Sequence, residues 1–272
     1  MKLNQLTFLI LFLMVCISPY AQFFSGARSL SLAGNSVTLN DVYTVHSNPG
    51  IISQIKEIQI GSSYSKPYLI SEFQQQSIAN FIPIQKGGII IRGVFSGKEL
   101  FRQQKIGLGY GFSLNEKLSI GIGLNHQELR IQHYKSSNKL TADIGFLAKI
   151  NDKLTLGASI LSVGGNQSKE NIERFPSIMQ IGIKYAIHNQ FDTYISIDKT
   201  ALNSVYYRIG FEYEAYKNLW FRTGCVLNAK VLAFGIGYEL PMRLRIDLGT
   251  QWNQILGWTP HIGLLYRFTT KK

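Results

Sequence analysis

The chain has 272 residues, 45% of them hydrophobic, with 28 Lys and Arg against 16 Asp and Glu and a formal net charge of +12. The cations are spread singly along the chain, which argues against the clustered basic face of a nucleic-acid-binding protein. Beyond the first 21 residues no stretch approaches 18 consecutive apolar residues, so the sequence predicts no transmembrane helix. No linker-like stretch divides the chain, which favours one domain.

The first 21 residues are typical of a secretory signal peptide. Lys2 precedes an apolar run over residues 6–17, and the segment ends in a PYA sequence at Ala21. Cys16 leaves a lipid anchor open, although the residue before it is larger than lipidation signals favour. After cleavage Cys225 would remain alone, so we expect no internal disulfide and a small apolar side chain on a strand.

Residues 22–55 differ from the rest of the chain. The stretch SGARSLSLAGNSVTLNDVYTVHSNPG, at 25–50, is rich in small residues, Ser and Asn, closes on an Asn-Pro-Gly turn and has no strand or helix period. Two interpretations are open. The segment is either a mobile periplasmic tail, which has a similar composition, or a segment that threads the interior of a barrel.

From residue 56 onward, apolar and polar residues alternate strictly, as in a strand with two different faces. Leu244, Ile246 and Leu248 point to one side, whereas Arg245 and Asp247 point to the other, a face too charged for an ordinary core. We predict fourteen such strands, at 56–65, 68–82, 87–97, 99–113, 117–133, 138–149, 152–162, 176–186, 190–199, 203–215, 218–227, 229–239, 242–252 and 259–268.

Most of these segments have the 9–11 residues that a tilted membrane strand needs. A soluble sandwich would give the same alternation, but the strand number, the signal peptide and the aromatic residues on the apolar face favour a membrane. Closing the sheet also removes its edges. The predicted fold is all-β: a transmembrane up-and-down antiparallel β-barrel of about fourteen strands over residues 56–272, with a short N-terminal hatch segment in the lumen.

The predicted connections set the orientation, because outer-membrane barrels have short periplasmic turns and longer outer loops. The longest predicted loop, at 163–176, would face outside. One strand departs from the pattern: after Asn125 the phase flips, so that Leu129 and Ile131 would face inward, and either a bulge or an extension beyond the bilayer would explain this. The many inward glycines suit strands that bend round a barrel. The predicted periplasmic turns are 83–86, 114–116, 150–152, 187–189, 216–217 and 240–241.

The segment over residues 26–49 resembles the N-terminal segment of the FadL-like outer-membrane proteins, including the PorV/PorQ group of Bacteroidota. The matching positions are Gly26, Ala27, Arg28, Leu30, Leu32, Gly34, Asp41, Asn48 and Pro49. This resemblance implies a fourteen-strand barrel in the Gram-negative outer membrane, with the segment folded inside as a hatch. The predicted hatch residues are Gly26, Ala27, Arg28, Asp41, Asn48, Pro49 and Gly50.

Charged residues on the inward faces form a second candidate site. They would either pair with one another and with the hatch, or, as a surplus of cations, attract anions into a pore. Because both positive and negative residues occur on these faces, we favour pairing. The predicted lumen charges are Arg92, Lys105, Lys149, Lys184, Arg208, Arg222, Arg243, Arg245, Asp143, Glu212 and Asp247.

Catalytic, cofactor and metal motifs are not recognisable in the sequence. No Ser, His and acid trio can be assembled around the scattered histidines, and glycine-rich stretches such as GLGYG lie within alternating strands and precede no helix. We therefore expect a non-enzymatic protein without a cofactor. The histidines are His46, His126, His133, His188 and His261.

Three functions remain open. The resemblance to PorV/PorQ implies an accessory or partner barrel in a type IX-like secretion or surface-assembly complex, and this is the first hypothesis. The resemblance to the fatty-acid branch implies a passive transporter of hydrophobic small molecules, with a lateral gap or kink in the wall and an apolar pocket between the hatch and the strands. A lipid-modifying enzyme would need a Ser and His pair at the rim. The expected partners are outer-membrane lipid, a larger protein complex or a hydrophobic solute, and not nucleic acid.

Overall fold

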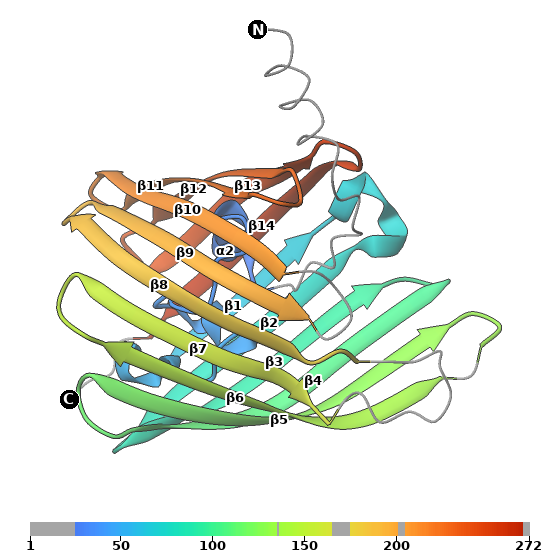
Figure 1. Ribbon diagram of the computed structural model, residues 1–272, viewed down its shortest axis with the longest axis horizontal. Coiled ribbons are helices and arrows are strands. Elements are labelled where there is room, and N and C mark those ends of the chain that lie inside the picture. Colours follow the sequence, from blue (N-terminus) through green and yellow to red (C-terminus); the bar gives the residue numbers. More distant parts are fainter. Residues whose placement is uncertain (1–24, 135, 165–174, 201–204, 269–272) are drawn as a thin grey trace, which may run out of the picture.

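The computed structural model describes residues 25–134, 136–164, 175–200 and 205–268, so the predicted signal peptide lies outside the described residues. Within these ranges, no helix has the length and apolar character to span a membrane. Fourteen antiparallel strands follow one another round a closed barrel, in which β14 pairs with β1 (Figure 1). The strands are β1 Gln59–Ser65, β2 Gln75–Ile84, β3 Gly87–Gly97, β4 Phe101–Ser113, β5 Leu118–Ile131, β6 Ser137–Lys149, β7 Leu154–Val163, β8 Ile178–His188, β9 Phe191–Thr200, β10 Val205–Tyr216, β11 Leu219–Val226, β12 Val231–Glu239, β13 Leu244–Asn253 and β14 Gly257–Arg267.

The predicted fold class is confirmed, and most strand ends agree with the predicted ranges to within three residues. The exception is the start of the second strand, predicted at residue 68. Residues there form two short turns, η3 (Pro67–Leu69) and η4 (Ser71–Phe73), and β2 begins only at Gln75. Tyr68 and Leu69 have positive φ angles of 55° and 59°, a left-handed conformation that cannot continue a strand.

The outer face of the barrel is apolar. On β5, Ile120, Ile122 and Leu124 are 38%, 58% and 71% exposed, whereas the alternating Ser119 and Gly121 are buried. Exposed large apolar side chains also occur on each of the strands from β2 to β14. A soluble protein would not present so wide an apolar belt to water, so this face meets hydrocarbon.

The phase change predicted after Asn125 comes from an extension and not from a bulge. β4 and β5 stay in one unbroken register from the Phe101–Ile131 pair to the Ser113–Ser119 pair. Inward residues therefore keep their alternation to the end of β5. These two strands run on past the apolar belt, where their polar side chains turn outward; we call residues 101–105 and 127–131 the outer extension.

The hatch, defined as residues 25–55, lies inside the barrel. It contains the one-turn helix α2 (Ala27–Ser31) and two 3-10 turns, η1 (Val42–His46) and η2 (Ile51–Gln54). Figure 1 shows α2 surrounded by strands. Every residue from 25 to 52 except Asn40 is buried.

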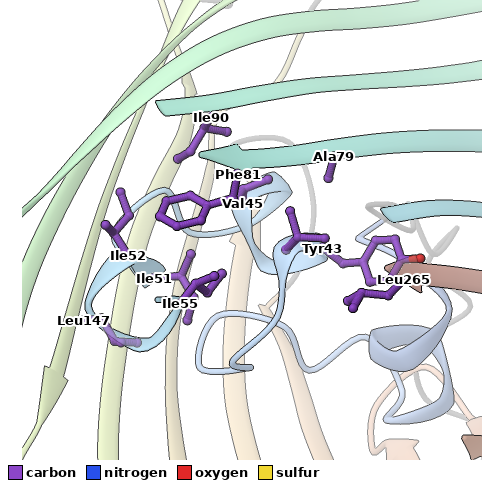
Figure 2. Close-up of a cluster of buried hydrophobic side chains, with 11 residues drawn as sticks. Tyr43, Val45, Ile51, Ile52, Ile55, Ala79, Phe81, Ile90, Leu147 and Leu265 are labelled. Atoms are coloured by element: carbon purple, nitrogen blue, oxygen red, sulfur yellow. The ribbon is translucent and has the colours of Figure 1, made fainter. Parts of the chain in front are cut away.

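Much of the apolar core lies between the hatch and the wall. Figure 2 shows Val45, Ile51 and Ile55 of the hatch against Phe81 and Leu147 of the wall. The hatch therefore occupies the space that inward side chains of a fourteen-strand barrel would leave unfilled.

Candidate functional site

A belt of inward glycines seats the hatch. A β-carbon at any of these positions would lie within about 3 Å of a hatch atom, for example 2.6 Å from Pro49 Cδ at Gly145 and 2.9 Å from Ala27 Cβ at Gly263. The glycines thus permit close approach of the hatch. This explains why glycine occurs at these positions more specifically than strand bending does. The belt consists of Gly61, Gly111, Gly121, Gly145, Gly157, Gly182, Gly210, Gly224, Gly235, Gly249 and Gly263.

Six charged side chains form a closed loop of ion pairs, here called the ionic ring. Two belong to the hatch, Arg28 and Asp41, and the others come from β10, β11 and β13. Three arginines alternate with three carboxylates, so the ring is neutral, and its side chains are 0–5% exposed. The pairs are Arg28–Asp41 at 2.9 Å, Asp41–Arg245 at 2.7 Å, Arg245–Asp247 at 2.9 Å, Asp247–Arg222 at 2.7 Å, Arg222–Glu212 at 2.5 Å and Glu212–Arg28 at 2.5 Å.

The ionic ring joins the hatch to the wall across a large sequence separation. Arg28 donates to Glu212, on β10, through both Nε and Nη2 and to Asp41 through Nη1. Because every charge in the ring has two opposite partners, the cost of burying it is offset only while the ring is complete. Removing one member would leave its neighbours charged, buried and short of a partner.

A second buried cluster holds the middle of the hatch. Asp143 on β6 lies 2.7 Å from Arg92 and 2.9 Å from Lys105, and its other oxygen accepts from the backbone N–H of Ser162 at 2.6 Å. Arg92 also donates to the carbonyl oxygen of Val45 in the hatch. The wall thus contributes hydrogen bonds to the hatch backbone as well as ion pairs to its side chains.

Arg208 and Asn48 fix two further points of the hatch. Arg208 pairs with Asp198 at 2.5 Å and donates to the carbonyl oxygen of Ala33 at 2.6 Å. Asn48 donates to the carbonyl oxygens of Val37 and Phe146 at 2.8 and 3.0 Å, and its Oδ1 accepts from the Gly50 N–H at 2.8 Å. The Asn-Pro-Gly turn is therefore tied to β6.

Three of the predicted lumen charges lie outside these clusters. Lys184 pairs with Asp192 at 2.7 Å, and both side chains are partly exposed. Lys149 and Arg243 were expected to line the lumen, but they lie at the rim, with side chains 44% and 43% exposed. Arg243 leaves the strand phase because its φ angle of 62° places it in the turn before β13, beside Glu57.

Burial shifts two pKa values in the hatch. Burial alone would raise the pKa of Asp41, but Arg245 and Arg28 outweigh it and lower the pKa to about 2. Burial lowers the pKa of His46 to about 3, and the nearby positive charges of Arg92 and Lys105 add to this. At neutral pH the docked hatch therefore carries an ionised Asp41 and a neutral His46.

A serine and a histidine do lie within hydrogen-bond distance, but in the lumen. Ser31 Oγ is 2.9 Å from His261 Nε2, both residues are buried, and His261 Nδ1 faces the carbonyl oxygen of Thr259 instead of a carboxylate. The pair links α2 to β14 away from the rim, so it does not meet the requirement for a lipid-modifying enzyme. Among the described residues, no group of three or more His, Cys, Asp or Glu could hold a metal ion.

The wall has no open seam among the described strands, because each strand pairs with both of its neighbours. It is irregular where the register of β6 against β7 shifts between Ala142 and Ile144. At the same place its outer face has an apolar hollow of about 740 Å³. The lining comes from β4, β5 and β6 and includes Leu108, Leu124 and Leu140.

Comparison of the sequence with known protein families and with curated proteins gives no match. Solved structures do match. The toluene transporter TbuX of Ralstonia pickettii aligns with 91% of this chain and 99% of its own, at 11% identity and a TM-score of 0.67. The CymD monoaromatic hydrocarbon channel aligns with 93% of this chain and 100% of its own, at 13% identity and a TM-score of 0.68. A FadL homologue of Pseudomonas aeruginosa aligns with 89% of this chain and 96% of its own, at 12% identity and a TM-score of 0.59.

The chain has the fold of the FadL-like outer-membrane barrels. At these identities the likeness establishes the fold, while the narrower PorV/PorQ resemblance stays a prediction. Sequence reasoning missed two hatch contacts within this fold. The hydroxyl of Tyr43 lies 2.8 Å from the carbonyl oxygen of Ser62 and 2.5 Å from that of Leu264, and Ser31 meets His261. Tyr43 stands as a single aromatic residue among small residues, and this feature of the sequence could have indicated its contact with the wall.

Proposed function

We propose that this protein is a passive, non-enzymatic transporter of hydrophobic small molecules. The observation that carries this proposal is the likeness of nearly the whole chain to structures named as toluene transporters and a monoaromatic hydrocarbon channel. This reverses the order of the two leading hypotheses. A solute would leave water at the outer extension, whose inward face combines the apolar Phe101, Leu129 and Ile131 with Gln103, Lys105 and Gln127, and would pass the wall near the irregularity at Asp143.

Uptake of radiolabelled toluene tests the proposal. The full chain is expressed in a Gram-negative host that lacks its own FadL-like protein, and uptake is compared with cells that carry an empty vector. We expect faster uptake of toluene and no change for a small sugar, because only the hydrocarbon gains free energy from contact with the apolar side chains of the outer extension. Equal toluene uptake by both strains, with the barrel folded in the outer membrane, would contradict transport.

The sealed interior favours a second candidate, an accessory barrel in a type IX-like secretion or surface-assembly complex, as resemblance to the PorV/PorQ group implies. The ionic ring and the continuous ladder of strands suit a rigid partner more than a gated pore. Extraction in mild detergent distinguishes the two: a stable larger assembly supports the accessory role, and a solitary barrel that still takes up toluene supports transport.

We further infer that the protein is delivered to the outer membrane after cleavage at Ala21. The apolar leader supports export, and the orientation rule for barrels then places the short turns in the periplasm and the outer extension at the cell surface. Mass measurement of the protein from outer membranes tests this inference, with Gln22 expected as the first residue.

A further inference from the structure

Two arginines face each other across the outer extension. The register pairs Arg102 of β4 with Arg130 of β5, so their β-carbons are roughly 5 Å apart on the same outward face. Like charges directly opposite one another in a sheet are destabilising. Both residues are exposed, and the side chain of Arg130 is 64% exposed. A pair in this position is suited to an anion that lies between the guanidinium groups.

Neighbouring charges leave the pair with a positive surplus. Glu128 lies 3.7 Å from Arg130, a distance near the limit of an ion pair, and its other oxygen accepts from Gln104. The opposite charges of Lys98 and Glu99 in the adjacent turn add up to zero. Two arginines against one remaining carboxylate give a local charge of +1, and an exposed ion pair at the limit of its distance contributes little to holding Arg130.

The arginine pair lies at the height of lipid headgroups. The apolar belt on these strands ends at Ile106, which pairs with His126, and Arg102 and Arg130 are each four residues farther along. Four residues correspond to roughly 13 Å along a strand, or about 10 Å of height at the tilt of a membrane barrel. Headgroups occupy roughly this layer outside the hydrocarbon core.

The apolar hollow described above begins directly below the pair on the same strands. Ile106 and His126 line its upper end, and Leu124 and Leu140 form part of its sides. The small Ala142 lies in the hollow and leaves room that a larger side chain would fill. With about 740 Å³, the hollow can accommodate part of an acyl chain.

We propose that this face binds a phosphate-bearing lipid of the outer leaflet, with a phosphate between Arg102 and Arg130 and an acyl chain in the hollow. The combination of cations at headgroup height and an apolar groove at hydrocarbon depth matches both halves of one amphiphile. The phosphate neutralises the repulsion between the arginines and forms charge-assisted hydrogen bonds with them. This inference does not depend on transport, because it concerns the outside of the wall.

Native mass spectrometry of the full chain in detergent, titrated with bis-phosphorylated lipid A, tests the proposal. We expect the double variant Arg102→Gln/Arg130→Gln to bind the lipid about tenfold more weakly than the wild type, because charge-assisted hydrogen bonds are lost. The matched control, Lys153→Gln/Lys217→Gln, removes two exposed cations from the opposite end and should leave binding unchanged. Equal binding by the wild type and the Arg102/Arg130 variant would overturn the proposal.

Two further measurements separate the sources of phosphate. Ala142→Phe fills the hollow and should weaken lipid A binding while the arginine pair stays intact. Dephosphorylated lipid A should bind as weakly to the wild type as lipid A binds to the arginine variant. Full competition by millimolar inorganic phosphate would instead identify a site for a soluble anion and refute the lipid assignment. Each measurement reads binding to the folded barrel, so it remains decisive if toluene uptake fails.

Discussion

At the scale of the residue, the glycine belt shows how a single hydrogen atom in place of a side chain positions the hatch. A β-carbon on Gly145 would meet Asn48 Oδ1, Pro49 Cδ and the Gly50 nitrogen, and three hydrogen bonds prevent the Asn48 side chain from moving aside. Gly93 provides a contrast, because a β-carbon there would lie 3.1 Å or more from the side chains of Phe95 and Ile78.

We expect Gly145→Ala to loosen the hatch and Gly93→Ala to leave it in place. Overpacking at Gly145 should cost about 1–3 kcal/mol, because the added methyl group displaces the turn at Asn48. Limited proteolysis of the folded barrel measures this as faster cleavage within residues 25–55. If both alanine variants are cleaved at the wild-type rate, the belt is not needed to seat the hatch.

His46 makes docking of the hatch dependent on pH. Its pKa is about 3 when docked, against 6.5 for an ordinary histidine, so between these values the released hatch binds one more proton. Docking therefore weakens as the pH falls below 6.5, by about 2 kcal/mol at pH 5. The pKa of Asp41 is about 2 in the docked hatch, against 3.8 for an ordinary aspartate. Protonation of Asp41 therefore weakens docking further below pH 4.

Hydrogen exchange of the hatch amides, corrected for intrinsic rates, measures this dependence. Protection should decrease from pH 7 to pH 5 in the wild type and change little over that range in His46→Gln. Arg92, Lys105 and Asp143 are the charged groups that act on this histidine, and both proteins retain them, so the comparison isolates the imidazole. A slope that persists in the variant would assign the effect to another group.

At the scale of the element, the hatch depends on the completeness of the ionic ring. Arg28→Gln leaves Asp41 and Glu212 buried with one partner fewer, and we expect a loss of about 3–5 kcal/mol in the free energy of docking. The double variant Arg28→Gln/Asp41→Asn removes one charge of each sign, so its loss should be smaller than the sum of the single losses.

The comparison needs an ion pair that is exposed to water. Lys149→Gln breaks the exposed pair with Asp152 and should leave the protection of the hatch close to that of the wild type. Hydrogen-exchange protection of residues 25–55 compares the variants on one scale. Additive losses in the double variant would mean that Arg28 and Asp41 are not coupled, which would contradict the ionic ring.

The elements could be predicted because two-residue alternation survives wherever one face meets lipid and the other an enclosed interior. The pattern failed at Tyr68 and Arg243, where backbone conformation overrides the side-chain phase. The hatch could be recognised as a segment with its own composition, and Arg28 and Asp41 as its charges. Their partners could not be assigned, because pairing across more than 180 residues depends on barrel register, which alternation alone does not determine.

At the scale of the whole molecule, a closed wall and a filled lumen mean that a solute on its way to the irregular wall at Asp143 has to displace part of the hatch. The hatch continues into β1, so its far end is already anchored, and a covalent bond at Ala27 would fix both ends. A β-carbon on Gly263 would lie 2.9 Å from that of Ala27, and a disulfide needs about 3.5 Å or more, so a shift of roughly 0.6 Å suffices.

We therefore expect Ala27→Cys/Gly263→Cys, in a Cys225→Ser background, to take up toluene more slowly when oxidised and to recover on reduction. Each single-cysteine variant controls for the substitution at its position. Mass spectrometry gives the extent of cross-linking, which must be near complete for the comparison. Unchanged uptake by the fully oxidised protein would show that the solute crosses without moving the hatch. The solute would then reach the irregular wall at Asp143 without displacing the hatch, because the lock leaves β6 and β7 free to part.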